Sequence, residues 1–459
     1  MNGTLTGLAL TIMRGFNKNQ SRGRTQKPGN LPAPKKARKG HTATKAYATL
    51  REATRTAVGL ANDQERKMNR APMADRWRSF GTSVFAEMTQ LASAHQAINL
   101  AQGFPDFEGP GEIVAAAERA LRAGHNQYAR SMGMPDLVQA IAAHQEDCYG
   151  LSFEPMREIM VTCGATEAIA ASLCGLLNPG DEVILFEPFY DSYPAMSVLA
   201  GATPRYLTLR FPDFSLEPDR LAKMIGPKTR GIVLNNPHNP SGKVFSEEEL
   251  SAIAKLANEH DLWVISDEVY EHLTYDGASH IPIASLPGMR ERTLTLSSTG
   301  KTFSFTGWKV GWACGPADLI QAAQAAHQFL TFSGAAPLQM AMAHALEHFQ
   351  KPFFDALRAA YAERRDVLVK ALEEAGFRVA LPRGTYFILA GFSHMFEGDD
   401  RALAKRLVTE AGVAAIPPSA FYSAAPREGA GLLRFAFCKR LETLERAAER
   451  LLKWQKPTF

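Results

Sequence analysis

Short apolar runs of the kind that form buried strands alternate with helical stretches over most of this chain. Six such runs follow one another from about Trp77 onward, at Glu158–Thr162, Glu182–Phe186, Gly231–Leu234, Leu262–Ser266, Thr293–Ser297 and Val310–Cys314. The helix after the third run begins with Ser246 and has Glu249 three positions on, which is a capping box. Strands that alternate with helices predict an α/β fold, with a mainly parallel sheet and helices on both of its faces.

The C-terminal part of the chain has a different pattern. Beyond about Phe353 it is more helical, with shorter strands near Tyr386–Leu389 and Leu433–Phe437. This change predicts a smaller α+β domain beside the large one. We expect an N-terminal arm with part of the small domain over 73–110, the large domain over 111–350 and the C-terminal small domain over 351–459.

The first 72 residues differ from the rest in charge and in apolar content. Residues 1–70 hold 15 Lys or Arg against 3 Asp or Glu, a net +12, whereas residues 71–459 carry a net −8. Few large apolar side chains lie between Phe16 and Tyr47, so we expect a basic, disordered extension. Three interpretations stay open: an organelle targeting peptide, a nucleic-acid arm, or a translated leader upstream of a working start at Met68 or Met73.

Apolar runs and cysteines limit the compartment and the partners. No apolar run reaches the ~18 residues that a membrane span needs, so no membrane partner is expected. The five cysteines are scattered with no close pair, at Cys148, Cys163, Cys174, Cys314 and Cys438. Such scatter favours a reducing compartment over a disulfide framework. We expect a cytoplasmic protein, with organelle targeting by residues 1–72 left open.

Polar, aromatic and glycine residues follow directly after the predicted strands, where open α/β sheets bind their ligands. The segments at these strand ends are Gly164, Glu187–Tyr193, Asn235–Gly242, Asp267–Tyr270 and Ser298–Lys301. They offer a lysine for a covalent bond, a carboxylate for a pyridine nitrogen, and Asn and Tyr for a phenolate oxygen. The glycine leads into a helix whose N-terminus suits a phosphate. The set therefore predicts a site for pyridoxal phosphate.

Two other short motifs point to different chemistry and are rejected. Gly300–Thr302 looks like the end of a phosphate-binding P-loop, but position 295, where that motif needs glycine, is Thr295. His344, Glu347 and His348 match an inverted zinc-protease motif on one helix face. No third ligand is evident, and the surrounding apolar pattern is typical of packing. We therefore expect no metal.

The chain resembles fold type I aminotransferases of the class I/II group from about Phe80 to Trp454. The motifs that carry the resemblance are Gly103–Phe107, Asn126–Tyr128, Gly164–Thr166, Glu187–Tyr190, Asn236–Gly242, Ser266–Tyr270, Ser297–Lys301, Gly307–Lys309 and Arg434–Phe437. Gly103–Phe107 and Thr302–Trp312 are similar to the branch of kynurenine/glutamine transaminases and bacterial methionine aminotransferases. The resemblance implies pyridoxal 5'-phosphate as cofactor and the fold type I architecture.

The resemblance also implies a role for each cofactor-binding position. Lys301 matches the Schiff-base lysine, which moves the proton between the substrate Cα and the cofactor. Asp267 matches the pyridinium partner, and Tyr270 and Asn239 match the two groups on the phenolate oxygen. The aromatic ring stacked on the pyridine matches Tyr190. The phosphate binders match Ala165, Thr166, Ser298 and Lys309, together with Tyr128 from the other subunit.

Substrate contacts follow from the same resemblance. Arg434 matches the clamp for the α-carboxylate, which a planar guanidinium grips with two hydrogen bonds. Gly103 and Asn239 match further substrate contacts, and Phe85 and Phe332 match positions that line the side-chain pocket. Two positions depart from the family: Lys309 stands where many relatives have Arg, and Thr166 stands where some have Tyr.

These residues predict an aminotransferase that works as a homodimer with shared active sites. An amino acid gives its nitrogen to the cofactor, and a 2-oxo acid takes it. We expect an uncharged donor that is sulfur-containing, aromatic or glutamine-like. Two alternatives remain: a carbon–sulfur β-lyase for cysteine conjugates on the same cofactor, and an aminotransferase-like sensor of a transcription regulator. The second is disfavoured because residues 1–46 lack the apolar periodicity of a helix-turn-helix domain, so no nucleic-acid partner is expected.

Overall fold

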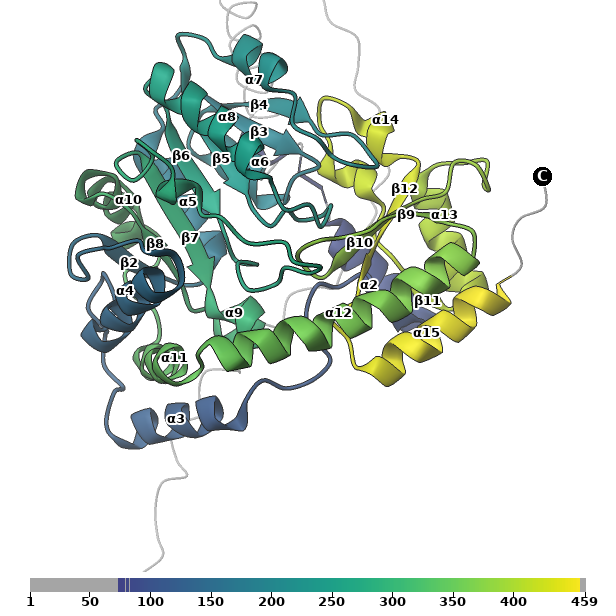
Figure 1. Cartoon of the computed structure of the whole chain (residues 1–459), viewed down its shortest axis with the longest axis horizontal. Coiled ribbons are helices and arrows are strands. Elements are labelled where there is room, and N and C mark those ends of the chain that lie inside the picture. The colour runs from purple at the N-terminus through teal and green to yellow at the C-terminus, as the bar shows by residue number, and fades with distance from the viewer. Residues whose placement is uncertain (1–72, 79, 82, 455–459) are drawn as a thin grey trace, which may run out of the picture. The chain divides into compact units, whose positions relative to one another are not determined.

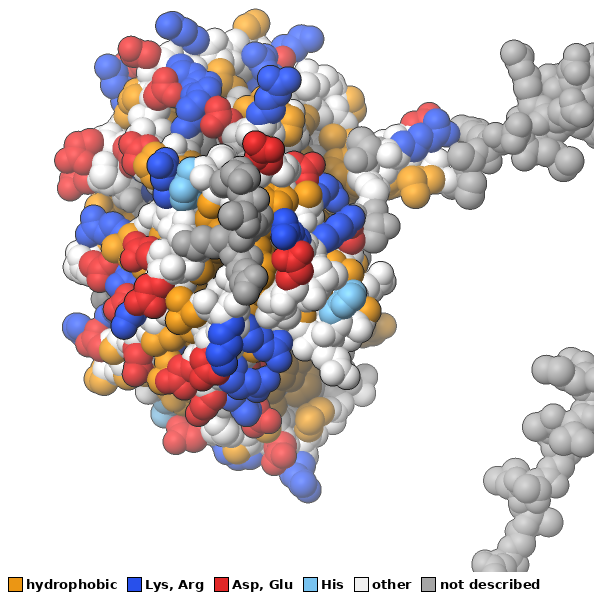
Figure 2. Space-filling model, turned by 90° about the vertical axis from the view of Figure 1, so that its right-hand side faces the viewer, with side chains coloured by type: hydrophobic (Ala, Val, Ile, Leu, Met, Phe, Trp, Pro, Cys, Tyr) orange, Lys and Arg blue, Asp and Glu red, His pale blue; other side chains and the backbone are white. Residues whose placement is uncertain are grey.

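The computed structural model describes residues 73–78, 80–81 and 83–454. The chain divides into two units, 1–72 and 73–459, and the described residues belong to the second. The predictions for residues 1–72 lie outside the described residues. Within the described ones, no helix is long and apolar enough to cross a membrane. Figure 2 shows acidic and basic side chains interspersed over one face of this unit.

A seven-stranded sheet forms the centre of the larger part of the unit (Figure 1). Its strands lie in the order β2 (Ile159–Thr162), β8 (Gly311–Cys314), β7 (Thr293–Ser298), β6 (Trp263–Asp267), β5 (Thr229–Asn235), β3 (Glu182–Glu187) and β4 (Thr203–Thr208). The pairs among β3 to β7 are parallel, whereas β8 runs antiparallel to both β2 and β7. The mainly parallel α/β sheet predicted from the apolar runs is confirmed.

Helices cover both faces of this sheet because successive strand residues point to opposite sides. Ile184 of β3 packs in one core with Leu250 of α8 (Glu247–Glu259). Leu185, the next residue, packs in another core with Ile169 of α5 (Ala165–Leu176). α6 (Ser192–Leu199) and α10 (Ala317–Leu330) also pack against α5. The predicted capping box of Ser246 and Glu249 begins α8.

Three further helices and a short one complete the larger part. α4 (Pro135–Tyr149) and α11 (Ala336–His348) pack on one another, and α3 (Gly111–Arg122) packs on α11. α7 (Pro218–Met224) lies against α8. His144 lies on α4 and is buried.

A second, smaller sheet carries Arg434. β12 (Leu432–Ala436), β10 (Phe387–Gly391) and β9 (Arg378–Ala380) pair antiparallel in that order, and α12 (Lys351–Glu374) and α15 (Leu441–Lys453) pack on each other. Near the start of the described unit, β1 (Ile98–Asn99) pairs with β11 (Val413–Ala414), and α2 (Val84–Ala94) contacts β11. α13 (Asp400–Arg406) and the short α14 (Pro426–Gly429) also contact β12. The N-terminal segment therefore shares a core with the C-terminal part of the chain.

Candidate active site

A cavity of about 280 Å³ lies where the parallel strands end. β5, β6 and β7 end there in Asn235, Asp267 and Ser298. The sequence-predicted residues that line it are Phe85, Gly103, Ala165, Thr166, Tyr190, Asn239, Asp267, Tyr270, Ser298, Lys301, Lys309 and Arg434. Both sheets contribute, because Arg434 belongs to β12 and the other strand residues belong to the large sheet.

Lys301 reaches this cavity from α9 (Thr299–Thr302), a single turn that follows β7 directly. Its Nζ lies 5.9 Å from the ring centre of Tyr270 and 5.7 Å from that of Tyr386. Burial lowers the pKa of Lys301 to about 8. A larger share of this amine is therefore neutral near physiological pH, which is the form that acts as a nucleophile.

Asp267 ends β6 and is held by neighbours on both its side chain and its backbone. Its Oδ2 accepts a hydrogen bond of 2.6 Å from the hydroxyl of Tyr193. Asn235 donates from Nδ2 to the Asp267 carbonyl at 2.8 Å. Burial raises the pKa of Asp267 to about 6, although the Tyr193 hydrogen bond acts in the opposite direction. Above that pH the group is an anion fixed in direction, as a partner for a pyridinium nitrogen must be.

The N-terminus of α5 meets Lys309 at the other end of the cavity. Gly164 precedes the helix with a φ of +77°, and no side chain caps the first turn. A Cβ at Gly164 would lie 3.1 Å from the Nζ of Lys309, and one at Gly311 would lie 2.6 Å from the Gly164 carbonyl carbon. Free backbone N–H groups and an ammonium thus gather where a phosphate would bind.

Arg434 is buried without an anionic partner among the described residues. Its Nη1 donates to Asn239 Oδ1 at 3.2 Å, its Nη2 donates to the Ala101 carbonyl at 3.0 Å, and its Nε has no hydrogen bond. The guanidinium carbon lies 4.1 Å from the ring centre of Phe387 and 5.1 Å from that of Phe85. Burial lowers its pKa to about 10, so it remains charged at neutral pH. A buried cation of this kind calls for an anion, which a substrate carboxylate can supply.

Gly103 lies against the aromatic residues of the small sheet. Its carbonyl accepts a 2.6 Å hydrogen bond from the Tyr386 hydroxyl. A Cβ at this position would come within 2.6 Å of the Phe387 ring. Only glycine therefore lets this backbone approach the cavity so closely.

Tyr128 and Phe332 do not line the cavity. Their rings contact each other edge to face, with centroids 5.6 Å apart, and Tyr128 is 88% exposed. These two residues can contribute to an active site only if that site belongs to a second subunit. Their assignment from the resemblance stays a prediction that depends on dimerisation.

Several residues that the sequence did not single out also belong to the site. Tyr193 belongs to Glu187–Tyr193, the segment at the end of β3. Its place at the end of a strand is the feature of the sequence that could have identified it. Phe387 reaches the cavity through the pairing of β10 with β12, which short strands in the sequence do not reveal. Gln102 lines the cavity as well, and its amide donates to Thr89 at 2.6 Å.

The rejected zinc motif lies away from the cavity. His344 and His348 are on α11, and the Nδ1 of His348 is 2.9 Å from the His344 carbonyl oxygen. No carboxylate or thiol joins them in a close group among the described residues. The group of His and carboxylate ligand atoms that those residues do bring together is elsewhere, at His144, Glu271 and His272.

A lysine, a carboxylate and an uncapped helix turn that suit the three attachment points of pyridoxal phosphate thus surround one cavity, next to an arginine without an ion pair among the described residues. This combination defines a pyridoxal-phosphate enzyme that acts on a carboxylate substrate. Residues 95–451 match the model of the family "Aminotransferase class I and II". The chain belongs to this family.

Relatives cover most of the chain. A probable N-succinyldiaminopimelate aminotransferase of Mycobacterium tuberculosis is 46% identical over 82% of this chain and 97% of its own length. A kynurenine–oxoglutarate transaminase of Dictyostelium discoideum is 42% identical over 82% of this chain and 95% of its own. A solved methionine aminotransferase of Escherichia coli superposes with a TM-score of 0.80 at 39% identity, covering 84% of this chain and 100% of that one.

These findings confirm the predicted family, its fold and its cofactor. The protein is an aminotransferase that uses pyridoxal phosphate and moves amino groups between amino acids and 2-oxo acids. The Lys301 amine, the Asp267 carboxylate and the open turn of α5 fit the cofactor's three attachment points.

Proposed function

We propose that the amino donor is an uncharged amino acid, sulfur-containing, aromatic or glutamine-like. The observation that carries the proposal is the aromatic wall around the one buried guanidinium of the cavity. Phe85 and Phe387 flank Arg434, and Phe421 lies 5.2 Å from it. One cation is thus available for the α-carboxylate, and the rings beside it favour a side chain without charge.

An N-succinyldiaminopimelate donor is the second candidate, because the relative at 46% identity carries that name. Such a donor brings carboxylates beyond the one that Arg434 would hold. Among the described lining residues, the other cationic side chains are Lys301 and Lys309, which lie at the cofactor end. The names of the kynurenine and methionine relatives support the uncharged donor instead.

The chain's own residues divide the chemistry in this proposal. Pyridoxal phosphate, when bound, supplies an electron sink that stabilises negative charge at the substrate Cα. Arg434 and Asn239 orient the substrate through its carboxylate, and Lys301 Nζ moves the proton at Cα. Asp267 keeps the pyridine nitrogen protonated, Tyr270 donates to the phenolate oxygen, and the turn at Ala165 holds the phosphate.

A donor panel with one 2-oxo acid tests the substrate class. Methionine, glutamine and kynurenine should each exceed aspartate and N-succinyldiaminopimelate in kcat/KM by at least about tenfold, because an acidic side chain would lie unpaired among rings. A leading rate with N-succinyldiaminopimelate would establish the second candidate. Pyruvate and ammonia released from a cysteine S-conjugate faster than transamination would assign the protein as a β-lyase.

We also propose a two-fold homodimer in which each subunit completes its partner's site. The supporting observation is a set of exposed aromatic rings: Phe332 packs on Tyr128, which is 88% exposed, and Phe329, three residues before Phe332, is 85% exposed. Exposed rings of this number are typical of a protein interface. Tyr128 would then contact the partner's bound phosphate.

Subunit mixing tests this sharing. Tyr128→Ala and Lys301→Ala should each be impaired alone, since each breaks both sites of its own dimer. After unfolding and refolding of a 1:1 mixture, half of the dimers pair the two variants, and each of these contains one intact site. Activity should return to about a quarter of the wild-type value. No recovery, with dimers confirmed by sedimentation, would place Tyr128 outside the partner's site.

A further inference from the structure

Three buried side chains from distant parts of the sequence come together near the ends of β6 and β7. His144 lies in α4, and Glu271 and His272 follow β6. His144 Nε2 is 3.4 Å from Glu271 Oε2 and 3.3 Å from His272 Nε2. All three ligand atoms lie within 4.8 Å of one another. They share no residue with the lining of the active-site cavity.

We propose that His144, Glu271 and His272 bind a divalent transition metal, with zinc as the best fit. Zinc takes imidazole nitrogen and carboxylate oxygen at about 2.0–2.2 Å in a tetrahedron, whose edges are then about 3.3–3.6 Å. The separations from His144 Nε2 to Glu271 Oε2 and to His272 Nε2, 3.4 and 3.3 Å, have this length, and the third pair of ligand atoms lies within 4.8 Å. Both contacts lie at the long end of hydrogen-bond geometry, so the spacing suits a metal ion as well as a shared proton, and the binding experiment distinguishes the two.

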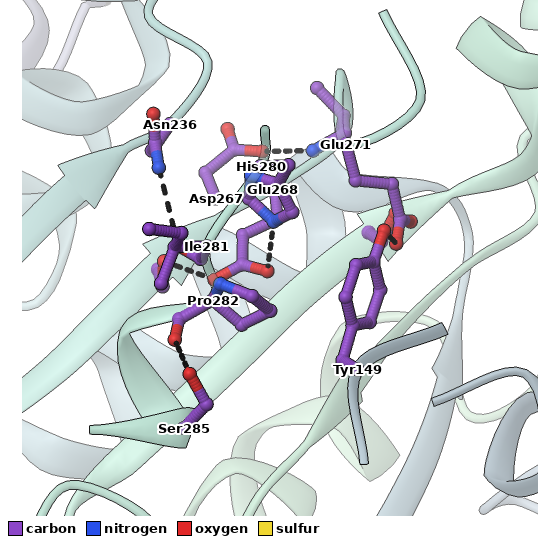
Figure 3. A network of polar contacts seen from close by, with 12 residues as sticks. Tyr149, Asn236, Asp267, Glu268, Glu271, His280, Ile281, Pro282 and Ser285 are labelled. Carbon is purple, nitrogen blue, oxygen red and sulfur yellow. Dashed lines mark hydrogen bonds and ion pairs between the residues drawn. The ribbon is translucent and has the colours of Figure 1, made fainter. Parts of the chain in front are cut away.

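The three ligands are oriented by neighbours, as metal ligands generally are. Glu271 accepts from the Tyr149 hydroxyl at 2.7 Å and from the Ser297 hydroxyl at 2.5 Å. Figure 3 shows the Tyr149 hydroxyl meeting the Glu271 carboxylate, with the hydrogen-bonded pair of His280 and Glu268 nearby. His144 Nδ1 lies 3.7 Å from the Cys148 sulfur, which leaves its Nε2 for the ion.

Stacking orients the ring of His272, whose Nε2 also contacts His144 Nε2 at 3.3 Å. Its ring lies parallel to that of Phe354, at 3.8 Å and an interplanar angle of 3°. This packing holds Nε2 toward His144 Nε2. Two facing imidazole nitrogens can share at most one proton between them, whereas an ion between them uses both lone pairs.

A second cavity, of about 640 Å³, adjoins the cluster, and we expect a fourth ligand of the ion to enter from it. Glu271 and His272 line it, together with Cys148, Tyr149 and His280. The Nδ1 of His280 is buried there without a hydrogen-bond partner. Two His and one Glu with an open fourth position is a set that zinc takes in proteins, with water or a small ligand completing it.

The position of the cluster gives the metal a structural consequence for the aminotransferase site. Glu271 follows Tyr270 in the chain, and its partner Ser297 precedes Ser298, which lines the active cavity. An ion at Glu271 therefore ties the segment after β6 to α4 and to β7. We expect it to raise the melting temperature of the enzyme.

Zinc titration of the full-length, cofactor-loaded enzyme after chelator dialysis tests the proposal. One zinc per chain should bind, and His144→Gln and His272→Gln should each weaken it more than about 100-fold, because a ligand is lost outright. His344→Gln/His348→Gln is the matched control, since it removes the other close histidine pair and should leave the stoichiometry unchanged. Zinc lost in this control but retained in His272→Gln would overturn the assignment.

Two further measurements do not depend on whether the His144 and His272 variants fold. Cobalt should bind in place of zinc and give the visible bands of a tetrahedral site, and zinc should raise the melting temperature of wild type and of the control variant alike. Absence of both effects would mean a hydrogen-bonded cluster with no ion. Neither readout needs turnover, so failure here leaves the proposed donor class untouched.

Discussion

Lys301→Ala should lower kcat by at least about 10²–10⁴-fold, because proton transfer at the substrate Cα and the covalent anchor of the cofactor are lost in one change. In the structure Lys301 lies on the single turn α9 that follows β7. It lines the same cavity as Asp267 and Tyr270. Single-turnover rates at saturating pyridoxal phosphate measure the effect, because the variant holds the cofactor through non-covalent contacts alone.

Two controls accompany this result. Lys255→Ala changes an exposed lysine that pairs only with Glu259 at 3.9 Å, so its kcat should equal that of wild type. Borohydride reduction of the wild-type enzyme should then fix the cofactor on the peptide that contains Lys301. A label on any other lysine would contradict the assignment even if Lys301→Ala were inactive.

The pH dependence gives the same assignment a second readout. Burial lowers the pKa of Lys301 from 10.5 to about 8, and the neutral amine is the nucleophile. Cofactor uptake by the cofactor-free enzyme should therefore rise with pH and level off above about 8. Uptake that keeps rising to about pH 10 would show an ordinary, solvated lysine.

The large sheet was predictable because its central strands are buried on both faces and so appear as continuous apolar runs. β4 escaped this signal, since its first residues alternate between exposed and half-buried positions at the edge of the sheet. The two-residue strands β1 and β11 escaped it as well, because their pairing joins segments more than 300 residues apart. Length and burial, rather than local propensity, decided which strands the sequence revealed.

Strand ends located many of the residues that line the cavity, since parallel strands bring their carboxyl ends to one edge. The small sheet offers no such rule, so the place of Phe387 at the cavity is seen only in the pairing of β10 with β12. Metal ligands are equally hard to recognise in the sequence when they come from distant segments. Helical spacing pointed to His344 and His348, whereas the close cluster joins His144 to His272 across 128 residues.

Arg434→Ala should weaken amino acids and 2-oxo acids alike, by about 2–5 kcal/mol in transition-state binding, because both carry the α-carboxylate that the guanidinium holds. Among the described residues no carboxylate forms an ion pair with this guanidinium, and its Nε has no hydrogen-bond partner, so we expect the substrate carboxylate to be the partner that is lost. The absorption of the bound cofactor should stay nearly normal. Arg434→Lys should recover only part of kcat/KM, since the two-pronged grip is gone.

Arg365 provides the matched control for this change. It is also buried, but its Nη1 and Nη2 already hold the Asp276 carboxylate, at 2.6 and 3.0 Å. Arg365→Ala should therefore lower the melting temperature and leave KM for amino acids unchanged. The deciding substrate is a primary amine without a carboxylate, which Arg434 cannot grip. If Arg434→Ala loses activity toward that amine as severely as toward amino acids, the arginine supports the fold and the carboxylate is bound elsewhere.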